Sequence, residues 1–209
     1  MPKPTFFNLP KEKQTVLIRA AKKEFSRVQL YEASIANIIK DAGIARGSFY
    51  QYFEDKEDAF FYLLEEHSKE NKQRFIEMLK ETEGHIFDTF TYMFQSMINN
   101  FNIEENHNFF KNAFLYMNHK VENAFTQEDN KEKFKQFFAQ MSDLTDSKIL
   151  NISANEEVFH VWQILMAITM RNLIQHYVRN LTKQEAINNF TTELALIKKG
   201  LYKAPDDHS

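Results

Sequence analysis

The stretch that decides the fold is SIANIIKDAGIARGSFYQYFEDK, residues 34–56. Its apolar residues recur at helical spacing in two short runs, one on each side of Gly43. The inner faces would comprise Ile35, Ile38, Ile39 and Ala42 in the first run, and Ile44, Phe49 and Phe53 in the second. Glycine readily adopts the left-handed conformation that ends a helix. Two short helices joined by a tight glycine turn are typical of a helix-turn-helix.

The side chains left on the outside of this arrangement suit the major groove of DNA. They are hydrogen-bond donors, small groups and amphipathic rings, which can reach base edges and phosphates. Arg46 could bind a guanine edge or a phosphate, Gly47 would let the backbone approach the groove, and Ser34 can cap its helix. The predicted DNA-binding residues are Ser34, Arg46, Gly47, Ser48, Tyr50, Gln51, Tyr52 and Lys56.

The charge distribution agrees with a DNA-binding head. The whole chain carries a net charge of −3, which alone argues against nucleic-acid binding. Residues 1–56, however, hold ten Lys/Arg and six Asp/Glu, a net charge of +4, so the remaining residues carry −7. A basic head on an acidic body is the asymmetry expected of a DNA-binding module, although chance clustering is an alternative for so small an excess.

The rest of the chain is predicted to be all-helical. Four Gly and four Pro in 209 residues leave few breaks, which indicates helices joined by short turns. Asp55 would cap the fourth helix, and the spacings Ser153 to Glu156 and Thr182 to Glu185 predict two capping boxes. Residues 1–8 are expected to be frayed. The nine predicted helices span about 10–27, 34–42, 45–53, 56–81, 85–101, 108–121, 130–150, 153–179 and 182–201.

The sequence also argues against other classes of protein. It has no cysteine, which excludes disulfides and thiolate metal sites, and it lacks the glycine-rich phosphate loops and nucleophile motifs of common enzymes. We therefore expect no enzyme activity, and the sequence identifies no cofactor. The N-terminus does not look like a signal peptide, and the apolar tract 158–170 is too short to cross a bilayer. We expect a cytoplasmic protein.

Residues 11–64 resemble the DNA-binding domain of TetR-type (tetracycline-repressor-like) regulators. The resemblance rests on AGIARGSFYQYF, residues 42–53, followed by Lys56-Glu57 and Phe60, and on an aromatic residue, Tyr31, ahead of the first short helix. Two positions depart from the family pattern: Ala33 and Ala45 stand where Thr or Ser is common. Each departure removes a helix cap or a phosphate contact.

The resemblance implies a nine-helix TetR-type fold and a repressor that binds DNA as a homodimer. The expected divisions are a three-helix DNA-binding domain at 1–55, a ligand-binding and dimerisation domain at 56–204, and a tail at 205–209. Two recognition helices in successive major grooves require a pseudo-palindromic operator, with half-sites about 34–36 Å or slightly more apart.

The last two helices are the expected dimer interface. The helix at 153–179 is apolar on nearly every side, so it should be buried on several faces. The resemblance implies that this helix and the next pair with their twins in a four-helix bundle, and the alternative is a single intramolecular core. The predicted interface residues are Leu165, Ile168, Leu173, Tyr177, Phe190, Leu194 and Ile197.

The middle helices are rich in Phe and Met, and the resemblance implies an inducer pocket between them. Ordinary core packing is the alternative for each such residue, but a pocket of this kind would suit a hydrophobic or flat aromatic small molecule. The predicted ligand-binding residues are His67, Phe90, Phe94, Met97, Phe114, Tyr116, Met117, Phe138, Trp162 and Leu165. A His or Tyr pair among His67, Tyr116, His119 and His160 could ligate haem iron. A helix-turn-helix regulator or adaptor without small-molecule sensing is the alternative function.

Overall fold

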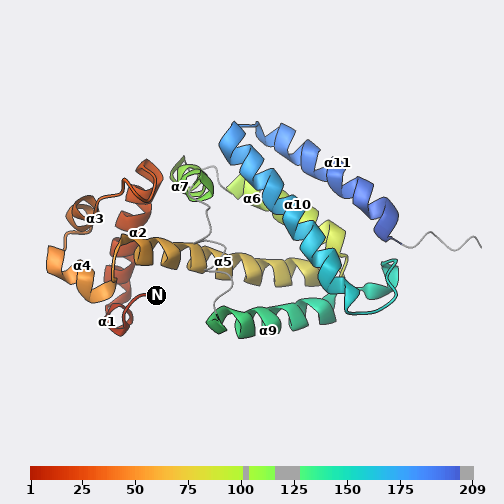
Figure 1. Ribbon diagram of the computed structural model, residues 1–209, viewed down its shortest axis with the longest axis horizontal. Coiled ribbons are helices and arrows are strands. Elements are labelled where there is room, and N and C mark those ends of the chain that lie inside the picture. Colours follow the sequence, from red (N-terminus) through yellow and green to blue (C-terminus); the bar gives the residue numbers. More distant parts are fainter. Residues whose placement is uncertain (101–103, 116–127, 203–209) are drawn as a thin grey trace, which may run out of the picture. The chain divides into compact units, whose positions relative to one another are not determined.

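The computed structural model of the chain describes residues 1–100, 104–115 and 128–202, and in them it contains α-helices, one 3-10 helix and no strand (Figure 1). An isolated antiparallel bridge joins Leu150 to Tyr202. The elements are α1 (Pro4–Phe7), α2 (Lys11–Arg27), α3 (Ile35–Ala42), α4 (Arg46–Tyr52), α5 (Lys56–Glu81), α6 (Ile86–Asn100), α7 (Glu104–Leu115), α9 (Glu128–Leu144), η1 (Ser147–Ile149), α10 (Glu157–Arg179) and α11 (Lys183–Leu201). The all-helical prediction is confirmed.

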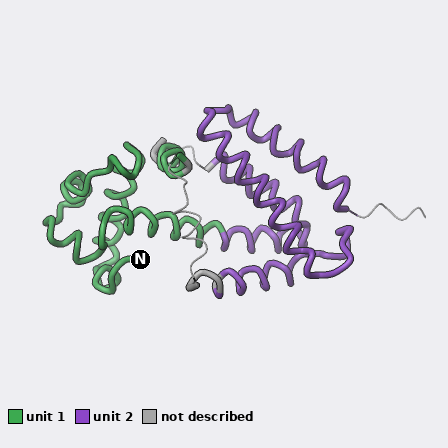
Figure 2. The backbone as a smooth tube through the Cα atoms, in the orientation of Figure 1, with its two compact units in different colours: residues 1–71, 101–118 green, residues 72–100, 119–209 purple. Residues whose placement is uncertain are grey.

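The described residues divide into two compact units (Figure 2). Unit 1 comprises residues 1–71 and 101–118, and α7 is the described part of the second range. Unit 2 comprises residues 72–100 and 119–209. Helix α5 contributes its first part to unit 1 and its last part to unit 2. The domain boundary predicted between residues 55 and 56 therefore falls inside unit 1, and α7, from the middle of the chain, belongs with the N-terminal helices.

Local sequence explains where several helices begin and end. Asp55 caps α5 as predicted, because its Oδ1 accepts the N–H of Asp58 at 2.8 Å. At the other end of α5, Gly84 has a φ of 81° and donates its N–H to Leu79 O at 2.9 Å. Thr182 and Glu185 form the predicted capping box at the start of α11. These local devices place α5 and α11 within a residue of the predicted bounds.

Four predictions of local structure are wrong. Residues 1–8 are not frayed, because α1 forms there and Phe6 is fully buried. Ser153 does not open α10 with Glu156: its N–H donates to the carboxylate of Glu157 at 2.7 Å, and α10 begins at Glu157. Helix α9 ends at Leu144, six residues early, because η1 follows it. Helix α7 begins at Glu104 rather than 108, and its predicted end at 121 lies outside the described residues.

Unit 2 is a helical bundle in which α10 lies against α6, α9 and α11, and α6 also lies against α11. Its core contains stacked rings of Phe94 and Phe190, whose centroids are 4.1 Å apart. One polar link crosses this interior: the amide of Asn172 on α10 donates to the carboxylate of Glu193 on α11 at 2.7 Å. None of the helices in the described part of the chain has the length and apolar character needed to cross a membrane.

Candidate nucleic-acid interface

Helices α3 and α4 form the predicted helix-turn-helix. Gly43 ends α3 with a φ of 65°, and the N–H of Ile44 bonds Ile39 O at 3.1 Å. This left-handed turn lets the chain reverse within three residues and start α4 at Arg46. Ile38 of α3 and Phe49 of α4 are both fully buried, so the two inner faces predicted from spacing meet in one core.

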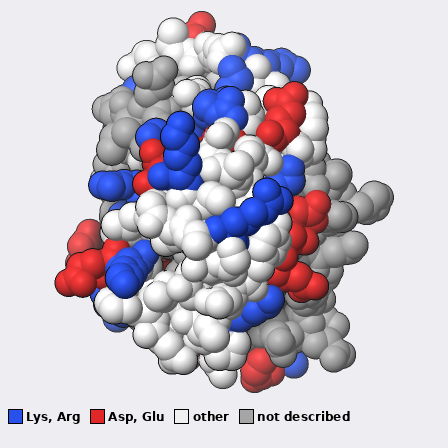
Figure 3. Space-filling model, turned by 90° about the vertical axis from the view of Figure 1, so that its left-hand side faces the viewer, with Lys and Arg blue, Asp and Glu red and all other residues white. Residues whose placement is uncertain are grey.

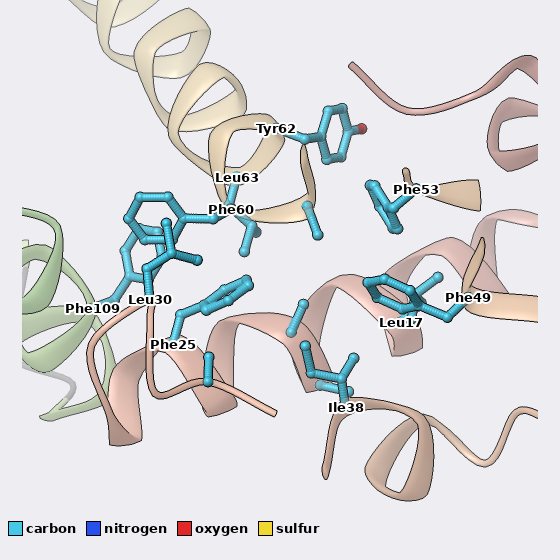
Figure 4. Close-up of a cluster of buried hydrophobic side chains, with 14 of the residues drawn as sticks. Leu17, Phe25, Leu30, Ile38, Phe49, Phe53, Phe60, Tyr62, Leu63 and Phe109 are labelled. Atoms are coloured by element: carbon cyan, nitrogen blue, oxygen red, sulfur yellow. The ribbon is translucent and has the colours of Figure 1, made fainter. Parts of the chain in front are cut away.

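That core fixes α4 against the rest of unit 1 (Figure 4). The ring centroids of Phe49 and Phe53 lie 5.5 Å apart, and those of Phe53 and Tyr62, on α5, lie 6.2 Å apart. Helix α7 closes another side, where Phe109 lies 5.6 Å from Phe60. The inward face of α4 is therefore held by aromatic packing, and its opposite face remains available to a ligand.

The start of α3 is anchored by a buried carboxylate that sequence reasoning missed. Glu24 of α2 accepts the N–H of Ser34 at 2.9 Å, the amide of Asn37 at 3.1 Å, and two N–H groups of Arg27. Burial raises the pKa of Glu24, but these hydrogen bonds outweigh it and hold the pKa below its ordinary value. An acidic residue on the buried side of a predicted helix was the available sequence signal.

Most of the predicted DNA-binding residues lie on the surface of α4. Arg46, Gly47, Tyr50 and Gln51 are exposed, with Tyr50 at 40%, while Ser48 and Tyr52 are half-buried. Viewed from this side of the molecule, Lys and Arg are spread among uncharged atoms, and most acidic side chains lie toward the sides of the view (Figure 3). The exposed side of α4 thus offers hydrogen-bond donors and an amphipathic ring, which suit contact with phosphates and base edges.

Two of the predicted residues are engaged in other ways. The Ser34 hydroxyl forms no capping hydrogen bond to α3, and its backbone N–H donates instead to Glu24. Lys56 donates its ammonium group to Tyr31 O at 2.6 Å and Ala33 O at 2.9 Å, and so ties the start of α5 to the loop before α3. These two bonds use two of its three donors. Lys56 therefore has a structural role that the sequence did not reveal.

The N-terminal residues also touch this site, although sequence reasoning left them out. The backbone N–H of Lys3 donates to Tyr52 O at 2.8 Å, and its ammonium group donates to Tyr50 O at 2.8 Å. Thr5 Oγ1 donates to Gln51 O. The signal that was available is the apolar pair Phe6-Phe7, which is unusual in a segment expected to be frayed.

The predicted ligand-binding residues fall into separate groups. In unit 2, Phe138 and Trp162 belong to an aromatic cluster that joins α5, α6, α9 and α10 by ring contacts of 4.8–6.5 Å. The members of this aromatic cluster are Phe75, Phe90, Phe134, Phe137, Phe138, Phe159 and Trp162. The indole N–H of Trp162 is buried and has no hydrogen-bond partner in the described structure.

The other predicted ligand residues lie elsewhere. Phe94 stacks on Phe190, Leu165 is fully buried on α10, and Met97 is half-buried on α6. His67 lies in unit 1, where its ring is 5.2 Å from that of Phe110. An open depression between α5 and α6 is lined by other residues, Met78, Glu81, Thr82, Tyr92, Gln95, Ser96 and Asn99. The side chain of Phe114, and Tyr116, Met117 and His119, lie outside the described residues, and His160 is exposed on α10.

Five of the predicted dimer residues are buried within the single chain. Leu165, Leu173, Tyr177, Phe190 and Leu194 expose at most 4% of their surface. Within the single chain these side chains belong to the helical core, and their assignment to the dimer interface remains a prediction. Apolar character marked them correctly as buried but did not show which face of α10 and α11 they occupy. Ile168 and Ile197 are half-buried.

Comparison with known proteins gives matches along both parts of the chain. The family model described as bacterial regulatory proteins, tetR family, matches residues 17–63. The model described as the tetracyclin repressor-like, C-terminal domain matches residues 85–201. The HTH-type transcriptional repressor NemR of Escherichia coli (strain K12) is 34% identical over 67 residues, which cover 32% of this chain and 34% of NemR. The chain thus matches only about a third of the length of this curated relative.

Solved structures share the fold at lower identity. The regulator FadR from Bacillus subtilis, in complex with stearoyl-CoA, aligns with a TM-score of 0.66 and 16% identity, covering 90% of this chain and 99% of FadR. SmeT, the repressor of the Stenotrophomonas maltophilia multidrug efflux pump SmeDEF, aligns with a TM-score of 0.66 and 14% identity, covering 95% and 93%. Together with the two family models, these findings show that the chain belongs to the TetR family of transcriptional regulators.

Proposed function

We propose that this protein is a dimeric repressor that reads a pseudo-palindromic operator with α4 and leaves it when an apolar or aromatic small molecule binds. The observation that carries the DNA-binding part is the two-sided character of α4. Phe49 and Phe53 fix the helix in a buried core, while Arg46, Tyr50 and Gln51 stand exposed on its other side. A short helix held rigidly by one face is suited to present the other to a major groove.

The experiment that tests this assignment begins by letting the wild-type protein enrich its preferred duplex from a random double-stranded library. Arg46→Ala and Tyr50→Ala should each weaken binding to that duplex by about 5- to 150-fold, as expected for the loss of a specific base contact. Lys13→Ala, an exposed cation on α2, is the matched control for loss of charge. Unchanged operator binding by both α4 variants would exclude α4 as the reading helix.

An exposed stripe on the last two helices supports the dimer. On α10, Ile164, Ile168, Arg171, Gln175 and Val178 follow each other at spacings of four and three residues, and each is exposed or half-buried. This is the spacing of a helix-packing seam. On the neighbouring α11, Leu196 exposes 63% of its surface. We propose this stripe, rather than the buried residues predicted from sequence, as the surface that pairs with a second copy.

The aromatic cluster supports a ligand site in unit 2. Planar phenylalanine walls around the buried indole N–H of Trp162 would suit an apolar molecule that carries a hydrogen-bond acceptor. FadR, a protein of the same fold, was solved in complex with stearoyl-CoA, which carries a long apolar chain. We propose the same chemical class for this chain.

Trp162 is the only tryptophan and can report on the ligand site directly. We expect that titration with stearoyl-CoA or with a flat aromatic probe such as anilinonaphthalene sulfonate shifts its fluorescence. The compound that does so should also release the protein from its selected duplex. A shift in fluorescence with operator binding unchanged at saturation would contradict the coupling, and would leave a regulator without small-molecule control.

A further inference from the structure

The N-terminal arm, residues 1–9, packs under the recognition helix rather than extending from it. Phe6 is fully buried, and its ring lies 5.2 Å from Phe53 and 5.3 Å from Tyr62. Leu9 packs against the same core. Because Phe53 directly follows α4, the arm is in contact with the end of the helix whose side chains are proposed to read DNA.

The arm also supplies the hydrogen bonds that the end of α4 lacks. A helix ends with four carbonyl groups that have no partner within the helix. In α4, the N–H of Phe53 bonds the carbonyl of Phe49 at 2.9 Å. The three carbonyls that follow, of Tyr50, Gln51 and Tyr52, accept hydrogen bonds from Lys3 and Thr5. The Lys3 ammonium group also places a positive charge at the negative end of the helix dipole.

A helix of seven residues needs such support. Isolated helices shorter than about 12–15 residues are marginal in water. The buried Phe49 and Phe53 hold the inner side of α4, but packing gives no hydrogen-bond partners to the carbonyls of its last turn, which carries Tyr50 and Gln51. The arm therefore controls the order of the turn from which these two side chains project.

We propose that the N-terminal arm is a positioning element for the recognition helix, in which Lys3 and Thr5 hold the last turn of α4 in the geometry that selects the operator sequence. This inference rests on the proposed function of α4. It differs from a phosphate contact by Lys3, which would strengthen binding to every sequence equally, and from a purely stabilising contact, which would change the folded fraction but not the sequence preference.

The test uses the full chain, with any affinity tag at the C-terminus, and measures affinity for the selected duplex and for a scrambled duplex. Thr5→Val removes the hydroxyl at constant shape, and Thr5→Ser restores it. The matched control is Thr15→Val, because Thr15 Oγ1 donates to Lys11 O at 2.9 Å within its own helix. We expect Thr5→Val to lower the ratio of selected to scrambled affinity about threefold or more, and Thr5→Ser and Thr15→Val to keep it.

Lys3→Met separates positioning from phosphate contact. If Lys3 positions α4, the ratio falls and the salt dependence of binding keeps its slope. If Lys3 contacts a phosphate, both affinities fall together and the slope drops by about one, which would overturn the proposal for Lys3. If Thr5→Val keeps the wild-type ratio of selected to scrambled affinity, the proposal that the arm positions α4 is overturned.

Arg46→Ala, measured in parallel, distinguishes failure of the arm from failure of the reading helix. If the ratio of selected to scrambled affinity falls in Arg46→Ala but stays at the wild-type value in Thr5→Val and Lys3→Met, only the proposal for the arm is wrong. A wild-type ratio in both Arg46→Ala and Tyr50→Ala removes the proposed function of α4 itself.

Discussion

Gly84 is the glycine of this chain whose replacement the structure resists most clearly. It has a φ of 81°, and a Cβ built on it would lie 2.5 Å from Leu144 O and 2.6 Å from Asp146 N. Gly84→Ala should therefore lower the free energy of unfolding by about 2 kcal/mol or more, since it combines left-handed strain with overlap against backbone. Chemical denaturation measures the change, and wild-type stability in this variant would contradict the close packing.

Gly47 gives the opposite expectation. It lies within α4, and apart from its chain neighbours and the nearby backbone of its own helix, no described heavy atom lies within 4 Å of a Cβ built on it. Gly47→Ala should keep or raise stability by up to about 1 kcal/mol, because alanine is the better helix former. If Gly47 allows close approach to the groove, the same variant weakens binding to the selected duplex. A stable variant with unchanged operator affinity would show that this position does not face the DNA closely.

Glu24 makes stability depend on pH in a definite direction. Its pKa in the folded protein lies below the ordinary value of 4.5, so ionised Glu24 stabilises the fold above that pH. As pH falls through the folded pKa, this contribution is lost. We expect Glu24→Gln to be less stable than wild type at pH 7, with a difference that shrinks below about pH 4.5. Glu12→Gln, on the exposed face of α2, is the matched control.

Residue types alone predicted which side chains of α4 are exposed, but not the hydrogen bonds that hold the helix-turn-helix in place. The aromatic and glycine pattern of residues 43–53 predicted which side chains of α4 would be buried and which exposed, because α4 lies on a single core. The roles of Glu24 and Lys56 depend on carbonyl and N–H groups at least ten residues away. Periodicity carries no information about such distant partners.

The ends of helices show the same limit of prediction from local sequence. Two stretches, residues 153–156 and 182–185, have the same capping-box spacing, but only the second forms one. Thr182→Ala should therefore cost about 1 kcal/mol of stability. Ser153→Ala should cost close to nothing, because Ser153 uses its backbone N–H and bonds Glu157. Equal losses in the two variants, measured by thermal unfolding, would contradict this difference.

Elements fixed by local signals were predicted well, and those fixed by tertiary contacts were not. Helix α5 has the predicted bounds because a cap and a glycine stop lie next to its ends. Helix α1 has only four residues, and it is held by Phe6 in the core and by bonds to α4. Its existence depends on a surface formed by residues about 45 positions later, which local sequence does not reveal.

The assembly of the whole molecule depends on which side of α10 and α11 faces solvent. If the exposed stripe pairs with a second copy, Ile164→Glu and Leu196→Glu should each shift the dimer toward monomer, because each places a charge in an apolar contact. Tyr92→Glu, at an exposed position on α6, serves as the control. Sedimentation velocity at micromolar concentration checks the shift, and dimers that persist in both stripe variants would place the interface elsewhere.

The central claim is that two copies of α4 enter successive major grooves. Dimethyl sulfate protection of the selected duplex tests it most directly, because guanine N7 lies in the major groove and adenine N3 in the minor groove. We predict protection of guanine N7 in two symmetric half-sites about 10 base pairs or slightly more apart, with a protected guanine lost in each half-site for Arg46→Ala. Protection of adenine N3 alone, or of a single half-site, would contradict it.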